Sequence, residues 1–162
     1  MQLGLISDTH NNKTNIQLAL TQLRSEGVST ILHAGDVTGV QALRLFAGFD
    51  LWIARGNMDH DPGLAYVAEE LFGPGRLRPG HRLRFNGATI AITHNGGVAS
   101  ARQLVMSGGC DYVITGHSHK RYEERVGRTR TINPGALGST RWHRPSYAVL
   151  DLDTANLRWF EL

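Results

Sequence analysis

The first twelve residues, Met1-Gln-Leu-Gly-Leu-Ile-Ser-Asp-Thr-His-Asn-Asn12, form a short apolar run that ends in a polar cluster. An apolar run bounded by turn-forming residues is typical of a buried β-strand that enters a loop. Asp8 and His10 lie in that loop. Apolar residues then recur at helical spacing between residues 15 and 25. The helix can begin at residues 13–15, and Gly27 can end it. The start of the chain therefore predicts a buried strand, a polar loop and a helix.

The same order of strand and helix continues to residue 71. We expect strands at 30–33 and 51–54, and helices at 40–46 and 64–71. Alternation of this kind implies parallel strands that are joined by helical crossovers.

The second half of the chain has a different pattern, in which hairpins predominate. Asn86-Gly87 is its strongest turn signal. The predicted elements are a helix at 100–106 and strands at 82–85, 88–93, 112–115, 121–125, 129–132, 147–151 and 157–160. Hairpins add antiparallel strands to the parallel ones. We therefore expect an α/β fold with two mixed sheets and helices on their outer faces. A three-layer fold with a single mixed sheet fits the same order of elements.

The composition is that of one folded domain. With 162 residues, 41% of them hydrophobic and 19% charged, the chain can bury a core. We expect a single domain over residues 1–162, because domains usually run to about 100–150 residues. A net charge of +3 with scattered basic residues is not the footprint of a nucleic-acid-binding protein. The single cysteine, Cys110, excludes an internal disulfide framework and a Cys-rich zinc module.

The sequence also lacks the signals of a membrane protein. Its longest apolar runs are shorter than the roughly 20 residues that span a bilayer. The amino terminus has no basic region, and its apolar run breaks at Asp8, unlike a secretory signal peptide. We therefore expect a cytoplasmic protein with no membrane partner.

Polar side chains follow five of the predicted strands at the point where each strand ends. These side chains are Asp8, His10, Asp36, Asn57, His94, His117 and His119. In open α/β folds the carboxyl ends of the strands meet at one edge, where ligands bind. Each residue alone could be an ordinary turn, cap or loop residue. Their shared placement at strand ends predicts that the seven converge.

The chemistry of this set points to a metal site. Two carboxylates, four imidazoles and one amide oxygen suit Mn²⁺, Fe²⁺, Co²⁺, Ni²⁺ or Zn²⁺ better than Ca²⁺ or a soft metal. Seven donors are too many for one ion with an open position, and they fit two ions that share a carboxylate. The chain contains no Gly-rich phosphate loop with a following Lys, which argues against nucleoside-triphosphate chemistry of that type.

Five short motifs carry a resemblance to a known family. They are Asp8-Thr-His10, Gly35-Asp36, Gly56-Asn57, Thr93-His94 and Gly116-His-Ser-His119. In this order and spacing they resemble the signature of the calcineurin-like metallophosphoesterases. The short length and Asn133-Pro-Gly135 are similar to the small bacterial and archaeal phosphodiesterase branch, whose fold is shared with the phosphoesterase-like subunit of the retromer coat. The resemblance covers nearly the whole chain and implies a four-layer α/β/β/α sandwich with a dinuclear metal site at one edge.

The resemblance also implies a role for each residue. Two divalent ions per chain are expected, with manganese as the expected metal and nickel, cobalt, iron or zinc as alternatives. Asp8, His10 and His119 would hold the first ion. The second ion would be held by Asn57, His94 and His117, and Asp36 would bridge the two ions. Asp36, Asn57 and His94 are also the expected catalytic residues. The expected nucleophile is a hydroxide that bridges the two ions, and the ions would neutralise charge on the transition state.

The sequence departs from the family pattern at three positions. Met58 stands where the wider superfamily often has His and the small branch has Cys, so no proton donor is available there. Asn95-Gly96 replaces a common Gly-His pair, and Ala136 replaces a common Ser. None of these changes removes an expected metal ligand, but the first two bear on substrate preference.

Two neighbours of the motifs have open roles. His33 either orients Asp36 or is a simple histidine at a strand end. Asp59 either braces the Asn57 loop or closes a turn.

The expected activity is metal-dependent hydrolysis of a phosphate ester, with a small phosphodiester as the substrate. A phosphomonoesterase for a small metabolite or phosphoprotein is the enzymatic alternative, although the short chain leaves little room for a substrate-specific cap. A non-catalytic scaffold on the same fold is the other alternative. A scaffold is free to lose metal donors, whereas all seven are present in this chain. The sequence does not define the physiological substrate, and it is compatible with a homo-oligomer.

Overall fold

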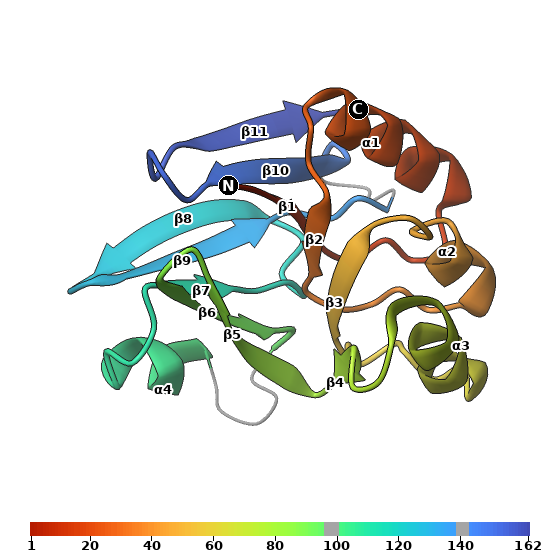
Figure 1. Ribbon diagram of the computed structural model, residues 1–162, viewed down its shortest axis with the longest axis horizontal. Coiled ribbons are helices and arrows are strands. Elements are labelled where there is room, and N and C mark those ends of the chain that lie inside the picture. The colour runs from red at the N-terminus through yellow and green to blue at the C-terminus, as the bar shows by residue number, and fades with distance from the viewer. Residues whose placement is uncertain (96–100, 139–142) are drawn as a thin grey trace.

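The computed structural model describes residues 1–95, 101–138 and 143–162, and it contains two β-sheets packed face to face (Figure 1). The first sheet has six strands, in the order β11 (Leu157–Glu161), β10 (Ser146–Asp151), β1 (Gln2–Ile6), β2 (Thr30–His33), β3 (Asp50–Ala54) and β4 (Leu77–Arg78). The second sheet has five strands, in the order β5 (Gly80–Phe85), β6 (Ala88–Thr93), β7 (Tyr112–Ile114), β9 (Thr129–Pro134) and β8 (Arg121–Val126). Both sheets are mixed.

Parallel strands make up one side of the first sheet, from β1 to its edge strand β4, and the centre of the second sheet. Strands β1 to β4 are parallel in the first sheet, and β6, β7 and β9 are parallel in the second. The outer strands β10, β11, β5 and β8 pair in the antiparallel direction. Helices α1 (Lys13–Ser25), α2 (Val40–Arg44) and α3 (Gly63–Phe72) cover the outer face of the first sheet (Figure 1). In the described parts of the chain, no helix is both long and apolar enough to span a bilayer.

Three apolar layers hold these elements together. Side chains alternate along β1, so Leu3 and Leu5 face the second sheet while Ile6 packs among the helices. Gly4 lets α1 approach the sheet closely, since a Cβ atom there would lie 3.2 Å from the Leu23 side chain. The short helix α4 (Ala101–Met106) packs on the outer face of the second sheet. The four-layer α/β/β/α sandwich is therefore confirmed, and the three-layer alternative is wrong.

The predicted elements differ from the observed ones mainly at their ends. Helix α1 begins at Lys13, within the predicted range for its start, and the Asn12 side chain caps it by accepting a hydrogen bond from the Asn15 N–H group. Strand β4 was not predicted, since two residues are too few to show alternation. The expected turn at Asn86-Gly87 is confirmed, with both residues at positive φ. The predicted helix start at Ser100 lies outside the described residues.

Candidate metal centre

The seven candidate residues lie at one edge of the sandwich, where loops from both sheets meet. Asp8, Asp36 and Asn57 follow the carboxyl ends of β1, β2 and β3 in the first sheet. His94 and His117 follow β6 and β7 in the second sheet. The contacts below join all seven side chains into one cluster, as the strand-end argument predicted.

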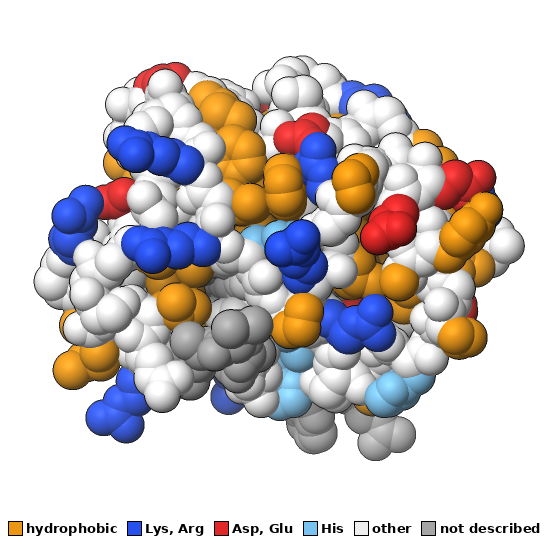
Figure 2. Space-filling model, turned by 60° about the horizontal axis from the view of Figure 1, so that its bottom comes forward, with side chains coloured by type: hydrophobic (Ala, Val, Ile, Leu, Met, Phe, Trp, Pro, Cys, Tyr) orange, Lys and Arg blue, Asp and Glu red, His pale blue; other side chains and the backbone are white. Residues whose placement is uncertain are grey.

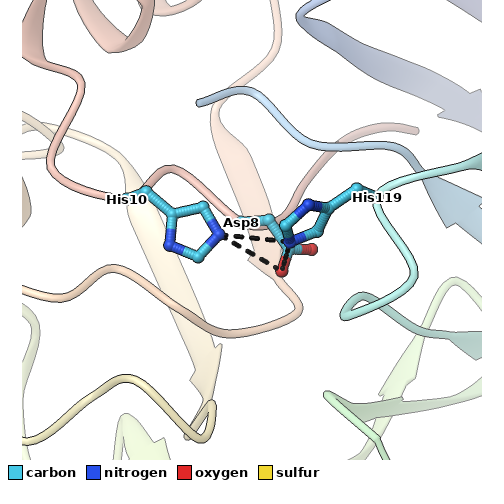
Figure 3. Close-up of side chains that lie close together, drawn as sticks. All are labelled: Asp8, His10 and His119. Atoms are coloured by element: carbon cyan, nitrogen blue, oxygen red, sulfur yellow. Dashed lines mark hydrogen bonds and ion pairs between the residues drawn. The ribbon is translucent and has the colours of Figure 1, made fainter. Parts of the chain in front are cut away.

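The first group consists of Asp8, His10 and His119 (Figure 3). The distance from His119 Nε2 to Asp8 Oδ1 is 3.2 Å, and that from His10 Nε2 to the same oxygen is 3.8 Å. The two Nε2 atoms are 3.2 Å apart. Ligand atoms that share one ion at about 2.0–2.2 Å from each atom lie at separations of this size. The three side chains thus surround a space that fits a divalent ion.

The second group is centred on the side-chain oxygen of Asn57. This oxygen lies 2.9 Å from His94 Nε2 and 3.0 Å from His117 Nδ1. His94 Nδ1 is 2.7 Å from the Ala34 carbonyl oxygen, so in the neutral ring the proton is on Nδ1 and Nε2 carries a lone pair. Two acceptors at 2.9 Å repel each other unless a cation lies near both. The donor set of the second group therefore also fits a metal ion.

Asp36 lies between the two groups. Its Oδ2 atom is 3.5 Å from His94 Nε2 and 3.9 Å from His10 Nε2. Its Oδ1 atom accepts a hydrogen bond of 2.8 Å from the Met58 N–H group. One oxygen is thus held by the backbone, and the other faces a histidine of each group.

The Asp8 carboxylate is also held by hydrogen bonds from nearby residues while it faces the first group. Its Oδ2 atom accepts hydrogen bonds from the Ser7 hydroxyl at 2.5 Å and the His117 N–H group at 3.0 Å. The same N–H group lies 3.3 Å from Oδ1, the oxygen that faces the first group. Asp8 is fully buried. Burial raises the pKa of this carboxyl group, whereas the Ser7 hydrogen bond and the charges of His94 and His119 lower it. A bound cation would favour the ionised form that burial disfavours.

The backbone of the site is strained. Among the described residues, five of the seven candidates have a left-handed backbone, at φ values between 43° and 67°. They are Asp8, His10, Asp36, His117 and His119. Non-glycine residues with positive φ are uncommon, and strain of this kind gathers at functional sites. The fold therefore holds these residues in costly conformations at the place where the candidate ligands meet.

Three glycines provide the close approach that the site needs. A Cβ atom on Gly56 would lie 2.0 Å from Asp36 Oδ1, and one on Gly116 would lie 2.8 Å from Asp8 Oδ2. A Cβ atom on Gly35 would lie 2.7 Å from His94 Nδ1. Each of these glycines lies against a candidate ligand. A side chain at any of the three positions would therefore displace that ligand.

Asp59 braces the Asp36 and Asn57 loops. This buried carboxylate accepts hydrogen bonds from the N–H groups of Asp36 at 3.1 Å, Thr38 at 2.8 Å and Gly56 at 2.7 Å. The bracing role is therefore confirmed.

Asn133 holds the His117 loop in a similar way. Its amide group donates to the Gly116 carbonyl oxygen at 2.7 Å and to the Ser118 hydroxyl at 3.1 Å. Its oxygen accepts from the Gly135 N–H group at 2.9 Å. The sequence showed Asn133 only as part of a motif, because its partners become neighbours only in the folded chain.

His33 supports Asp36 through Thr9. The Gly35 N–H group donates to His33 Nδ1 at 3.1 Å, so in the neutral ring the proton is on Nε2, which lies 3.3 Å from Thr9 Oγ1. The Thr9 hydroxyl then donates to the Asp36 carbonyl oxygen at 3.3 Å. His33 is fully buried. Of the two roles left open by the sequence, these contacts favour support of the backbone at Gly35 and Asp36.

The burial of His33 predicts a pH-dependent stability. Burial, together with the charges of His94 and His10, lowers the pKa of His33 to about 3. An unfolded histidine has a pKa of about 6.5, so below that pH the unfolded state binds a proton that the folded state does not. Stability from this group is complete above about pH 6.5 and is lost as the pH falls toward 3, by up to about 1.4 kcal/mol per pH unit.

Urea unfolding between pH 7 and pH 4, in EDTA, measures this effect. His33→Gln should unfold more easily at neutral pH but show a flatter dependence on pH than the wild type. The two proteins differ only at residue 33, so the difference between the slopes isolates His33. Equal slopes would contradict the assignment.

Hollows border the cluster at different residues. One of about 370 Å³ is lined by Asn57, His94 and His117 together with Arg55 and other residues. Another, of about 170 Å³, touches the cluster at His119. On the face shown in Figure 2, exposed histidine side chains lie near Lys and Arg side chains. The sequence analysis missed Arg55, whose only signal is its position next to Gly56-Asn57.

Met58 contacts the site through its backbone N–H group, and its side chain is exposed. Its N–H group holds Asp36, whereas its side chain is 48% exposed. A thioether has no proton to donate. The position that is often His in the wider superfamily thus contributes only a backbone contact.

A two-sheet α/β sandwich with carboxylate and imidazole side chains gathered at one edge defines a class of metal-binding hydrolases. The chain belongs to the calcineurin-like phosphoesterase superfamily, whose domain model matches residues 1–155. Family membership implies divalent metal ions. Within the described residues, two sets of side chains place their ligand atoms close enough together to hold an ion: Asp8, His10 and His119, and Asp8, Asp36 and His94.

Relatives cover almost the full chain. A phosphodiesterase of Methanocaldococcus jannaschii is 27% identical over 161 residues, which are 98% of this chain and 97% of the relative. A probable metallophosphoesterase of Methanothermobacter thermautotrophicus is 30% identical over 160 residues, 97% of this chain and 89% of the relative. A solved structure of an archaeal phosphodiesterase superposes with a TM-score of 0.90 at 27% identity and covers 100% of both chains. The chain is therefore a phosphoesterase by family.

Proposed function

We propose that this protein is a phosphodiesterase with two divalent metal ions, which we expect to be manganese. Asp8, His10 and His119 would hold one ion. Asn57, His94 and His117 would hold the other, and Asp36 would contact both. The observation that carries the proposal is the position of Asp36 Oδ2, which faces a histidine of each group at 3.5 and 3.9 Å.

Bound divalent ions would supply a hydroxide nucleophile and positive charge for the phosphoryl oxygens. The protein's own part is to hold the donors in place. His94 donates to the Ala34 carbonyl oxygen, which fixes its ring and directs the Nε2 lone pair toward Asn57 and Asp36. Asp59 fixes the loops that carry Asp36 and Asn57 relative to each other. Geometry fixed in advance is what electrostatic catalysis requires.

A diester is the preferred substrate class because of the space around the cluster. One hollow borders the cluster at Asn57, His94 and His117, and another borders it at His119, so each can take a substituent of a phosphate bound at the cluster. The named phosphodiesterase relative supports the same choice.

The proposal is tested by reconstitution with manganese and a substrate screen. Elemental analysis should find two ions per chain, because the seven donors form two groups around Asp36. The loaded protein should hydrolyse nitrophenyl diesters faster than the matching monoesters. A full activity with at most one ion per chain would reject the two-ion site, and a clear preference for monoesters would reject the substrate class.

A further inference from the structure

The hollow beside His119 is lined by charged side chains that have no part in the proposed metal centre. Besides His119, its described lining includes Arg121 at the start of β8, Arg144, and Glu161 at the end of β11. Arg121 forms an ion pair with Glu161, and Arg144 Nη1 lies 3.8 Å from the same carboxylate. In the described parts of the chain, the two guanidinium groups thus share the Glu161 carboxylate.

One carboxylate cannot satisfy both arginines. Each guanidinium has five N–H donors, whereas a carboxylate offers about four acceptor positions. At 3.8 Å, Arg144 is beyond hydrogen-bond distance from Glu161, and its side chain is 81% exposed. Among the described residues, the ion pairs with Glu161 therefore leave donors on both arginines for an additional anion. The two arginines and one glutamate give this lining a net positive charge.

Arg121 is held in position by its surroundings. A Cβ atom on Gly135 would lie 3.0 Å from Arg121 Cγ, so the arginine packs against this glycine. Its ion pair with Glu161 links β8 of the second sheet to β11 of the first. A guanidinium that is fixed in advance loses less entropy when it binds an oxyanion in the bidentate manner.

The size and place of the hollow restrict what it can bind. Its volume is about 170 Å³, below the roughly 300–1,000 Å³ of pockets that hold whole small molecules. The hollow beside Asn57 measures about 370 Å³, and among the described residues the two hollows have no lining residue in common. A diester centred on the cluster would therefore direct one substituent into the larger hollow and a small anionic group into the smaller one.

We propose that the Arg121–Arg144 hollow binds a second phosphate of the substrate. The preferred substrates are then short phosphodiesters that carry a terminal phosphomonoester, such as phosphorylated dinucleotides. This proposal rests on the proposed function in one respect, because it places the scissile phosphate at the seven-residue cluster.

The test compares the thymidine dinucleotides TpT, pTpT and TpTp, which differ only in a terminal phosphate. With the manganese-loaded protein, kcat/KM for cleavage of the internal diester should be about tenfold higher for pTpT or TpTp than for TpT, mainly through a lower KM. Arg144→Gln should remove most of this preference and leave TpT hydrolysis unchanged. Arg121→Gln should act in the same direction. Arg128→Gln is the matched control, since Arg128 is also an exposed arginine paired with an acid, Asp111, outside the hollow.

A binding measurement separates this proposal from the proposed function. Calorimetry of the metal-free protein in EDTA should show tighter binding of pTpT or TpTp than of TpT, and Arg144→Gln should abolish the difference. Equal binding and equal kcat/KM for the three dinucleotides would overturn the phosphate hollow while leaving the diesterase intact. Absent hydrolysis with a retained, Arg144-dependent binding difference would support the hollow and reject the diesterase.

Discussion

Asp36→Asn is expected to lower kcat/KM for a nitrophenyl diester by about 10³-fold or more, because it removes a charge that both proposed ions share. The fold should persist. An asparagine oxygen can still accept the Met58 N–H group that now binds Asp36 Oδ1. Elemental analysis after manganese loading should find fewer than two ions per chain, and thermal unfolding without metal should stay close to that of the wild type.

Asp50→Asn is the matched control for this change. Asp50 begins β3, at the opposite end of the strand from Asn57, and its exposed carboxylate pairs with Arg76. Its replacement removes the same charge without reaching the cluster, so both activity and metal content should be retained. Activity of Asp36→Asn close to that of Asp50→Asn would show that Asp36 does not contact both ions.

Gly56→Ala should be almost as damaging, although it adds only a methyl group. The new Cβ atom would lie 2.0 Å from Asp36 Oδ1 and 2.3 Å from the Asp36 backbone nitrogen. Neither atom can move freely, because the nitrogen donates to Asp59 and the oxygen accepts from Met58. Either Asp36 or the Asn57 loop must shift, and a displacement of about 1 Å can cost about 10²-fold in rate. We also expect a loss of about 1–3 kcal/mol in stability from overpacking.

Gly109→Ala controls for the loss of glycine itself. The nearest atom to a Cβ there is the end of the Arg82 side chain at 3.2 Å, which can move away. Activity and unfolding temperature of Gly109→Ala should be near those of the wild type. A Gly56→Ala variant with normal activity and two bound ions would mean that the Asp36 and Asn57 loops are not held in the contact described above.

The elements of the fold were predictable wherever the pattern of apolar residues was long enough to be seen. Helix α1 shows several turns of apolar spacing, and β6 follows a strong turn signal, so both were placed within a few residues. Strand β4 is too short for any such pattern. The four-layer arrangement itself came from the family resemblance, because the order of elements alone also fitted a single sheet.

The convergence of the candidate ligands was predictable because parallel strands place their carboxyl ends at one edge. The contacts that hold the ligands in place were less accessible from the sequence. For Asp59 the sequence left two roles open, and it showed Asn133 only as part of a motif. Their hydrogen bonds reach loops that are 15 to 23 residues away in the chain. The left-handed backbone at Asp8 and His117 likewise follows from the meeting of distant loops, so neighbouring residues do not reveal it.

The two candidate groups each draw on both sheets. His10 of the first group comes from the loop after β1, while His119 comes from the loop after β7. In the second group, Asn57 follows β3 in one sheet and His94 follows β6 in the other. An ion in either group would therefore link the two sheets directly. Between the sheets the other contacts are mainly apolar and non-directional. Metal binding and the mutual docking of the two sheets are then one linked equilibrium, so the affinity for the ion also sets how firmly the halves of the molecule stay together.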